Sequence, residues 1–306
     1  EVVQDYGLVR YVNIEQKGGG NYLKENTTWA KQTISHNTVV QNETSHFNGK
    51  YEIGSKHHSE KYLFSVEDDN LQVASAKEKN TYPGTNLHRT MVTIKDEDYP
   101  NPYVLDIMRV TSENENQYDL PFYYLGQIMQ TSFDFTKLEI PQILGNSNGY
   151  QHLFKEAQAV SNGENLKLNW LLNNKFYSYT SVTSSNDEII LARIGANDPE
   201  YNLRSEPTLI LRKKNVKDVV FASIIESHGT YSPVSEFAVN AYSNIKNISV
   251  VYDSKDYTSV KIKTKKGKQH VFIISNSNAS KEGKHSLEIN KKSYQWVGPF
   301  YYTIIN

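Results

Sequence analysis

The 306-residue chain contains no cysteine. Disulfides, thiolate catalysis, zinc fingers and cysteine-ligated iron–sulfur clusters are therefore excluded for it. Long apolar runs are also missing, since no stretch approaches the roughly 18 apolar residues that a membrane helix needs. The sequence thus predicts a protein without a membrane span.

An excess of charge of either sign is absent too. Lys plus Arg number 33 and Asp plus Glu number 34, which gives a formal net charge of −1. This balance excludes a broad basic surface of the kind that grips nucleic acid, but it leaves room for a small basic cleft for an acidic ligand. Tyrosine is abundant at 22 residues. Aromatic residues suit both β-sheets and sugar-binding clefts, so their number alone does not choose a function.

Helical periodicity is scarce along the chain. The segment from Gln151 to Ser161 fits one helix, but it fits a strand equally well. Most other segments are short apolar stretches separated by Asn, Gly, Asp, Ser and Lys turns, which predicts strands. These predicted strands are Thr38–Gln41, Lys61–Val66, Leu87–Ile94, Tyr103–Ser112, Lys167–Leu172, Phe176–Val182, Ile189–Ile194, Thr208–Arg212, Val219–Ile225, Ser249–Tyr252, Ser259–Lys263, His270–Ser275 and Tyr301–Ile304. The fold class that follows is all-β, a large antiparallel β-sandwich.

No sharp linker divides the chain, and its weakest boundary lies near Asn197–Glu206. We expect one β-domain over residues 1–306, with a smaller final sheet from about residue 240, where the composition becomes richer in Lys, Asn and Ser. The chain opens on Glu1 without Met or a signal segment. We interpret it as the C-terminal part of something longer; the alternative is a mature start after a removed signal peptide.

Standard catalytic motifs are missing, but one region is dense in reactive side chains. The sequence has no Gly-x-Gly-x-x-Gly after a strand, phosphate loop, His-Glu-x-x-His or Gly-x-Ser-x-Gly. Instead, polar residues with strong chemical character cluster between Asp5 and Asn48. A search for function therefore begins there.

Two segments of that region carry a resemblance. Trp29 to Val40 reads Trp-Ala-Lys-Gln-Thr-Ile-Ser-His-Asn-Thr-Val-Val, and Ser45 to Gly49 reads Ser-His-Phe-Asn-Gly. They resemble the heparinase II/III-like domain of polysaccharide lyases, above all the oligoalginate lyases of polysaccharide lyase family 17. The likeness runs from roughly Val2 to Glu236 and loosens after the first fifty residues. The looser matches are His88–Met91, Leu105–Val110, Tyr118–Pro121 and Glu226–Gly229.

The resemblance implies a zinc ion held by two His and one Asp. Asp5 and His36 match two of these ligands, and the remaining His is expected upstream of Glu1. A neutral imidazole and a carboxylate both suit Zn²⁺. Spacing alone leaves another reading open, in which His36 is a strand-end histidine bonded to a backbone carbonyl. By residue type His46, His57 and His58 are rival ligands, although His57 and His58 lie in a polar loop and are expected to be solvated.

The resemblance also implies a β-elimination on a uronate sugar, with Tyr22 as the base and Arg10 binding a substrate carboxylate. A free phenol has a pKa near 10, so a phenolate at about pH 7 costs roughly 4 kcal/mol. Nearby cations such as Arg10 would lower that cost, and a guanidinium can bind both carboxylate oxygens. On their own, Tyr22 is a turn residue after a glycine run and Arg10 a surface strand residue.

The implied activity is the depolymerisation of alginate oligomers, from a chain end, by a periplasmic or secreted enzyme. The family's acid and its carboxylate-neutralising groups lie in an N-terminal helical (α/α) toroid, so we expect this chain alone to be inactive. A homodimer is a further possibility. Two competing hypotheses are a non-catalytic glycan-binding β-sandwich and a lyase acting on a glycosaminoglycan.

Two later motifs carry less weight. Glu226 and His228 are spaced like a catalytic pair, but hydrogen bonds from a strand to a turn are the favoured reading. Near Asp119 the family often carries histidines, where this sequence has Gln117 and Tyr123. That departure leaves the preference for mannuronate or guluronate open.

Overall fold

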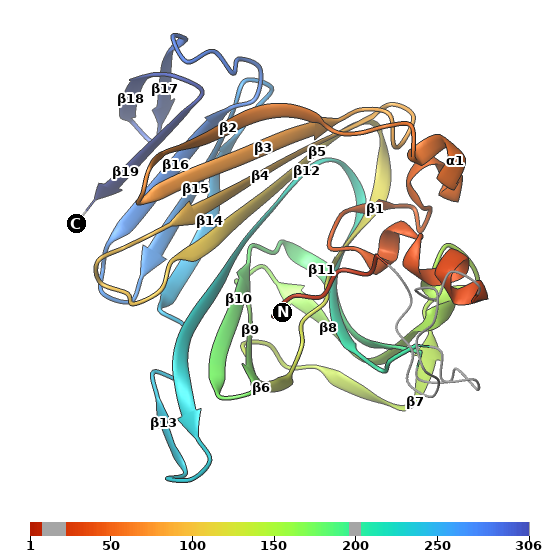
Figure 1. The fold of residues 1–306 in the computed structure, drawn as a ribbon. Helices are drawn as coiled ribbons and strands as arrows, with labels where there is room; N and C mark the ends of the chain where they lie inside the picture. The colour runs from red at the N-terminus through yellow and green to blue at the C-terminus, as the bar shows by residue number, and fades with distance from the viewer. Residues whose placement is uncertain (8–22, 196–202, 306) are drawn as a thin grey trace.

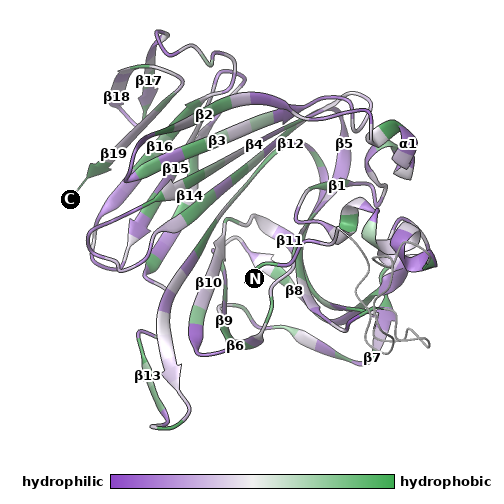
Figure 2. Ribbon diagram, in the orientation of Figure 1, coloured by the Kyte–Doolittle hydropathy of each residue, from purple (hydrophilic) through white to green (hydrophobic). Residues whose placement is uncertain are grey.

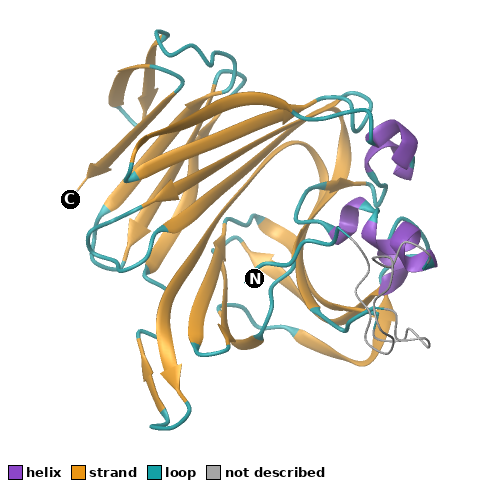
Figure 3. Cartoon of the chain, in the orientation of Figure 1, coloured by secondary structure: helices purple, strands orange, loops and turns teal. Residues whose placement is uncertain are grey.

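The computed structural model describes residues 1–7, 23–195 and 203–305, and most of their regular elements are strands (Figure 3). The helical elements are short and gather on one side of the molecule: a π-helical turn Asn26–Ala30, 3₁₀ turns Thr33–Ser35, His46–Gly49 and Tyr150–His152, and α1 Tyr51–Gly54. The strands are β1 Val40–Gln41, β2 Glu60–Asp68, β3 Leu71–Glu78, β4 Thr85–Ile94, β5 Tyr103–Phe122, β6 Gln127–Thr131, β7 Thr136–Ile143, β8 Leu153–Asn162, β9 Leu166–Leu172, β10 Lys175–Ser181, β11 Ser185–Ile194, β12 Pro207–Ser232, β13 Phe237–Val239, β14 Ile245–Asp253, β15 Tyr257–Thr264, β16 Gln269–Ser275, β17 Lys284–Ile289, β18 Lys292–Val297 and β19 Phe300–Ile305.

The described strands form three antiparallel sheets (Figure 1). A 13-stranded sheet runs in the order β2-β3-β4-β5-β12-β10-β9-β6, and from β12 a branch continues through β11 and β8 to β7. A four-stranded sheet, β14-β15-β16-β19, packs against β2–β5, and the hairpin β17–β18 completes the molecule. This arrangement confirms the predicted all-β antiparallel sandwich.

Period-two alternation explains why these segments become strands. Along β17 exposed and buried residues alternate, with His285, Leu287 and Ile289 buried. The same alternation starts β3, where Leu71 and Val73 face the core. Figure 2 shows the resulting mixture of apolar and polar blocks on the ribbon. Alternation of this kind buries one face of a strand and leaves the other polar.

Two strands are far longer than the sequence predicts. The predicted strand Tyr103–Ser112 is only the first half of β5, and Thr208–Arg212 and Val219–Ile225 both belong to the 26-residue β12. The middles of both strands are exposed and polar, and their pairing register shifts between Lys213 and Val216. Such an irregular exposed stretch looks like a turn in sequence, although the strand continues through it. The expectation of short strands was wrong for this pair.

The ambiguous segment from Gln151 to Ser161 is a strand. It starts in a 3₁₀ turn and continues as β8, in which Ala157, Ala159 and Ser161 are buried. β8 pairs with β11 and β7, and this pairing outweighs the local fit to a helix.

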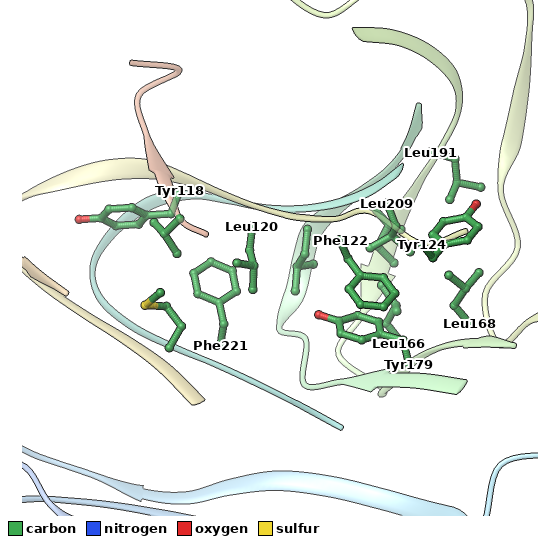
Figure 4. Packing of buried hydrophobic residues seen from close by; sticks show 14 of the residues in the cluster. Tyr118, Leu120, Phe122, Tyr124, Leu166, Leu168, Tyr179, Leu191, Leu209 and Phe221 are labelled. Atoms are coloured by element: carbon green, nitrogen blue, oxygen red, sulfur yellow. The ribbon is translucent and has the colours of Figure 1, made fainter. Parts of the chain in front are cut away.

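Four apolar cores form among the described residues; one lies between β16 and the β17–β18 hairpin, and the other three hold the large sheet and its neighbours. The first fills the curled part of the large sheet, where Phe122 stacks on Tyr179 with ring centroids 4.2 Å apart (Figure 4). The second lies between the large and the four-stranded sheets and includes Ile107, Ile224 and Phe272. The third holds the N-terminal segment in place; its buried residues are Tyr6, Trp29, Ala30, Ile34, Val40, Tyr123, Tyr150, Leu153, Ile190, Ala192, Ile194, Leu203 and Ile210.

Candidate functional site

Asp5 and His36, far apart in sequence, lie side by side. His36 Nδ1 is 2.7 Å from Asp5 Oδ1, and the two side chains are 31% and 65% exposed. The pKa of the Asp5 carboxyl is lowered, chiefly by this hydrogen bond. The pair is therefore both formed and open to solvent.

The other ring nitrogen of His36 fixes what Nδ1 can do. His36 Nε2 lies 3.1 Å from the carbonyl oxygen of Ala30. Because a carbonyl only accepts, Nε2 must carry a proton and donate it. The Asp5 carboxylate also only accepts, so in the absence of a metal ion Nδ1 must donate a proton to it. A metal ion bound between Nδ1 and Asp5 would replace that proton. A carbonyl that orients the far nitrogen is the usual support of a metal-bound histidine.

The pair fits two corners of a zinc site in residue type. Zinc bonds to nitrogen and oxygen are about 2.0–2.1 Å long, so two ligands of a tetrahedral ion lie about 3.3 Å apart, slightly farther than this hydrogen bond. Within residues 1–7, 23–195 and 203–305 no group of three His, Cys, Asp or Glu side chains is arranged to hold a metal. A complete tetrahedral site would therefore need at least one further protein ligand in addition to Asp5, His36 and water.

The next residue, Asn37, ties the N-terminal segment to the large sheet. Its Nδ2 donates to the Gln4 carbonyl oxygen at 2.7 Å, and its Oδ1 accepts from the Tyr123 amide at 2.8 Å. The Gln4 amide also donates to the Tyr123 carbonyl oxygen at 2.8 Å. The His-Asn dipeptide therefore holds both sides of the Asp5 segment, one through each side chain.

Arg89 on β4 also holds the His36-Asn37 dipeptide in place. Its Nη1 donates to the Asn37 carbonyl oxygen at 2.6 Å, while Nε and Nη2 form a two-point contact with Asp106 at 2.9 and 2.6 Å. Asp106 pairs with Met91 across β4 and β5, so Arg89 reaches it diagonally. Two segments matched only loosely in sequence, around residues 88 and 105, thus support the strongly matched one.

A cavity of about 380 Å³ opens beside this cluster. Its lining includes His46, Phe47, Lys77, Glu78 and Arg89. The two cations outnumber the one carboxylate, and because Arg89 is already paired with Asp106, Lys77 is the cation that an acidic ligand would meet.

The Ser45–Gly49 motif forms one wall of that cavity in a strained turn. Phe47 and Asn48 have φ values of 56° and 55°, followed by Gly49 at 69°. Asn and Gly tolerate this left-handed region, but Phe does not, so the turn stores about 1 kcal/mol or more at Phe47. The Phe47 ring stacks on His57 at 5.0 Å, which helps to hold the turn.

The rival ligands take other roles. His46 is partly buried with Nε2 3.1 Å from the Val39 carbonyl oxygen, and desolvation lowers its pKa to about 4. His57 stacks on Phe47, and His58 contacts the Ser59 carbonyl oxygen at an exposed position.

Tyr6 is buried and bonded to Glu206, and its burial beside Glu206 raises its pKa far above the ordinary value. Tyr6 is thus unsuited to act as a base.

Arg10 and Tyr22 lie outside the described residues, so their predicted roles in carboxylate binding and proton abstraction remain predictions. The described chain ends at Gly7 and resumes at Leu23 on either side of them. The described residues on either side, Asp5 and the π-helical turn Asn26–Ala30, are both held through His36, which contacts Asp5 and the Ala30 carbonyl oxygen.

A charged network near Asp119 was not anticipated. Asp119 is fully buried; Arg212 donates to both its carboxylate oxygens at 2.7 Å, and Tyr150 adds a bond of 2.6 Å. Arg212 also reaches Glu43 at 2.8 Å. The partners come from four distant segments, which sequence spacing does not bring together. With its hydrogen-bonding capacity used internally, this network joins β1, β5 and β12 rather than meeting a ligand.

Glu226 and His228 do not form a catalytic pair. Glu226 accepts bonds from Ser243 and from the Asn244 amide, while His228 contacts Ser178 and the Asn240 carbonyl oxygen. The favoured reading, bonds from a strand to a turn, is confirmed.

Known proteins agree with this architecture. The family model for heparinase II/III-like C-terminal domains matches residues 1–263. An exo-oligoalginate lyase of Saccharophagus degradans is 39% identical over 97% of this chain and 41% of its own length. An alginate lyase of Stenotrophomonas maltophilia is 38% identical over 97% of this chain and 40% of its own length. The chain thus spans about two fifths of either relative.

A solved structure of a heparinase III gene product with methylated lysines shares the fold. It superposes with a TM-score of 0.55 over 90% of this chain and 34% of its own length, at 12% identity. No helix in the described part of the chain is long and apolar enough to cross a membrane. The match of the family model over most of the chain, together with close relatives over nearly all of it, places this protein among the heparinase II/III-like C-terminal domains.

Proposed function

We propose that this domain is the β-sandwich part of a polysaccharide lyase that depolymerises alginate oligomers, from a chain end, by β-elimination. The observation that carries the proposal is the 39% identity over 97% of the chain with an exo-oligoalginate lyase. The open Asp5–His36 pair beside a basic cavity supports it, because an acidic sugar needs such a lining.

In the proposed reaction Tyr22, as a phenolate, removes the proton at C5 of the uronate. The C4–O4 bond breaks, a C4=C5 double bond forms, and an acid protonates the leaving O4. The C5 proton is poorly acidic while the neighbouring carboxylate is charged, so donors must neutralise that carboxylate and stabilise the developing negative charge. Arg10 binds a substrate carboxylate, and its positive charge favours the ionised form of Tyr22.

Asp5 and His36 would hold a structural zinc ion together with a histidine upstream of Glu1. The ion would supply rigidity by joining the Asp5 segment to the turn before His36. Tyr22 lies between these two residues in sequence. The Asp5–His36 contact and the hydrogen bond from Asn37 to Gln4 would therefore fix the chain on both sides of it. The other catalytic groups would come from an N-terminal helical toroid, and residues 1–306 alone are expected to be inactive. Export to the periplasm or medium, where alginate is met, and a homodimer complete the proposal.

The test is the ultraviolet absorbance of the unsaturated product after full-length protein is incubated with polymannuronate, polyguluronate and heparan sulfate. We expect product from one or both alginate polymers and none from heparan sulfate. Product from heparan sulfate alone would make the protein a glycosaminoglycan lyase. Binding of alginate without product would make it a non-catalytic glycan-binding sandwich.

A further inference from the structure

A second basic cavity lies away from the candidate site. It measures about 210 Å³ and is lined by Gln130, Thr131, Ser132, Lys167, Asn169, Tyr242, Ser243 and Lys265. None of these residues lines the cavity beside Arg89. Along β9, Lys167 and Asn169 alternate with Leu166, Leu168 and Trp170 of the first core, so they face the opposite side of the sheet.

Two ammonium groups approach each other at this cavity. Lys167 Nζ donates to the carbonyl oxygens of Ile245 and Lys246 at 3.0 and 2.9 Å. Burial and the nearby charge of Lys265 lower the Lys167 pKa, and the charge of Glu226 opposes that shift. Lys265 Nζ lies 5.8 Å from the centre of the Tyr242 ring. Among the described residues that line the cavity there are two lysines and no carboxylate. Glu226, outside the lining, balances part of this charge, and an anionic ligand would balance the rest.

The buried Glu226 supports this cavity and offsets part of its positive charge. Its carboxylate accepts from the Ser243 hydroxyl and, at 2.9 Å, from the Asn244 amide. The Asn244 carbonyl oxygen in turn accepts from the Lys265 amide at 2.8 Å. Glu226 thereby fixes the turn that carries Tyr242, whose side chain is 64% exposed. Its negative charge also acts on Lys167, so the two lysines and Glu226 together leave a net positive charge for a ligand.

We propose that this cavity is a second, non-catalytic binding site for an acidic sugar, a uronate residue of a polysaccharide chain. The lysines would bind the carboxylate, the exposed Tyr242 ring would pack on the sugar face, and the Gln130 and Ser132 side chains would bond its hydroxyls. The volume is below the roughly 300 Å³ of the smallest drug-sized pockets, which suits a single sugar residue. The identity of the sugar rests on the proposed function.

The direct test is calorimetric titration of full-length Tyr22→Phe protein with a mannuronate or guluronate trimer, compared with the same protein carrying Lys265→Gln or Tyr242→Ala. Both side chains are exposed, so the fold is not at stake. We expect two binding events in the parent and a loss of about tenfold in affinity for one of them in either variant. Lys284→Gln, which removes another exposed lysine on β17, should leave both events unchanged.

Control ligands separate the possible sources of binding. Equal binding of a neutral trisaccharide, or binding of inorganic sulfate without the trimer, would overturn the proposal. So would two unchanged events in both variants.

A kinetic comparison in otherwise unaltered protein separates this inference from the proposed function. Lys265→Gln should raise KM for long alginate and leave kcat, and the cleavage of trimers, unchanged. Protein that cleaves alginate but binds it independently of Lys265 would overturn the second site alone. Protein that cleaves nothing, yet binds the trimer through Lys265, would overturn the lyase proposal alone.

Discussion

Among the described residues, two His–Asp pairs have similar N···O distances in very different surroundings. His36 Nδ1 lies 2.7 Å from Asp5, and His270 Nε2 lies 3.0 Å from Asp96. The first pair is open, whereas His270 and Asp96 are 1% and 0% exposed in their side chains. The closed pair has further partners, since Tyr302 contacts His270 Nδ1 at 2.6 Å and Lys268 contacts Asp96 at 2.9 Å.

This difference shows that residue type and distance do not by themselves make a site. The closed pair joins the Asp96 turn to the four-stranded sheet, and its partners are all within the protein. The open pair leaves a carboxylate facing solvent beside a basic cavity. An ion pair with unused bonding capacity can serve a ligand, while one enclosed on all sides serves stability.

The largest expected effect is a loss of turnover when Tyr22, which lies between Asp5 and His36 in sequence, is replaced. Tyr22→Phe should lower turnover by about two to four orders of magnitude, because it removes the proposed base. Stability should be unchanged, since only one hydroxyl is lost. Steady-state kinetics and thermal melting of the full-length protein test this together. Retention of more than a tenth of the wild-type rate would remove Tyr22 from the mechanism.

A substitution in the closed pair should lower stability and leave turnover nearly unchanged. His270→Asn should lower the free energy of unfolding by about 3 kcal/mol, because Asp96 would lose a buried partner. Turnover per folded molecule should stay within about twofold, as the pair is remote from the proposed chemistry. Denaturant titration measures the first quantity and active-site-normalised kinetics the second. An unchanged midpoint would show that Lys268 alone satisfies Asp96.

A third histidine makes stability depend on pH. Burial, with help from the charges of Lys77 and Arg109, lowers the pKa of His88 to about 3 from its ordinary 6.5. Below pH 6.5 the unfolded chain binds this proton and the folded chain does not, so stability falls as the pH falls. The slope approaches about 1.4 kcal/mol per pH unit, or about 2 kcal/mol between pH 6.5 and 5.

Denaturant titrations across that range, with His88→Gln and the exposed His58→Gln as a matched control, measure this dependence. His88→Gln should flatten the pH dependence relative to wild type, and His58→Gln should not. Equal slopes in all three proteins would assign the effect to other groups.

The smallest expected effect is the loss of stability when His36 of the open pair is replaced in the absence of metal. His36→Ala should cost about 1 kcal/mol in chelator, because exposed ion pairs contribute little. With zinc the gap between wild type and variant should widen, since metal binding to the folded state adds stability. Melting temperatures in chelator and in zinc, with elemental analysis, test this. A gap that does not depend on zinc would contradict a metal at this pair.

Sequence reasoning reached the fold class because period-two alternation survives in sequence, whereas the meeting of Asp5 with His36 was implied only by the resemblance to a lyase family. The continuity of β12 through Lys213–Val216 was missed, since a polar, irregular stretch resembles a turn. Arg89 and Asp106 were missed as partners because a diagonal contact depends on strand register. Burial is likewise invisible in sequence, so the Asp96–His270 pair had no signal at all.

The central claim is that the open pair belongs to the functional site and the closed pair to the scaffold. The direct measurement is turnover of alginate oligomers per folded molecule, well below the melting temperature, for full-length His36→Ala and His270→Asn. We predict a loss of about tenfold or more for His36→Ala, because its loss lets the Tyr22 segment shift, and near wild-type turnover for His270→Asn. Full turnover in His36→Ala, with the loss in His270→Asn instead, would contradict the account.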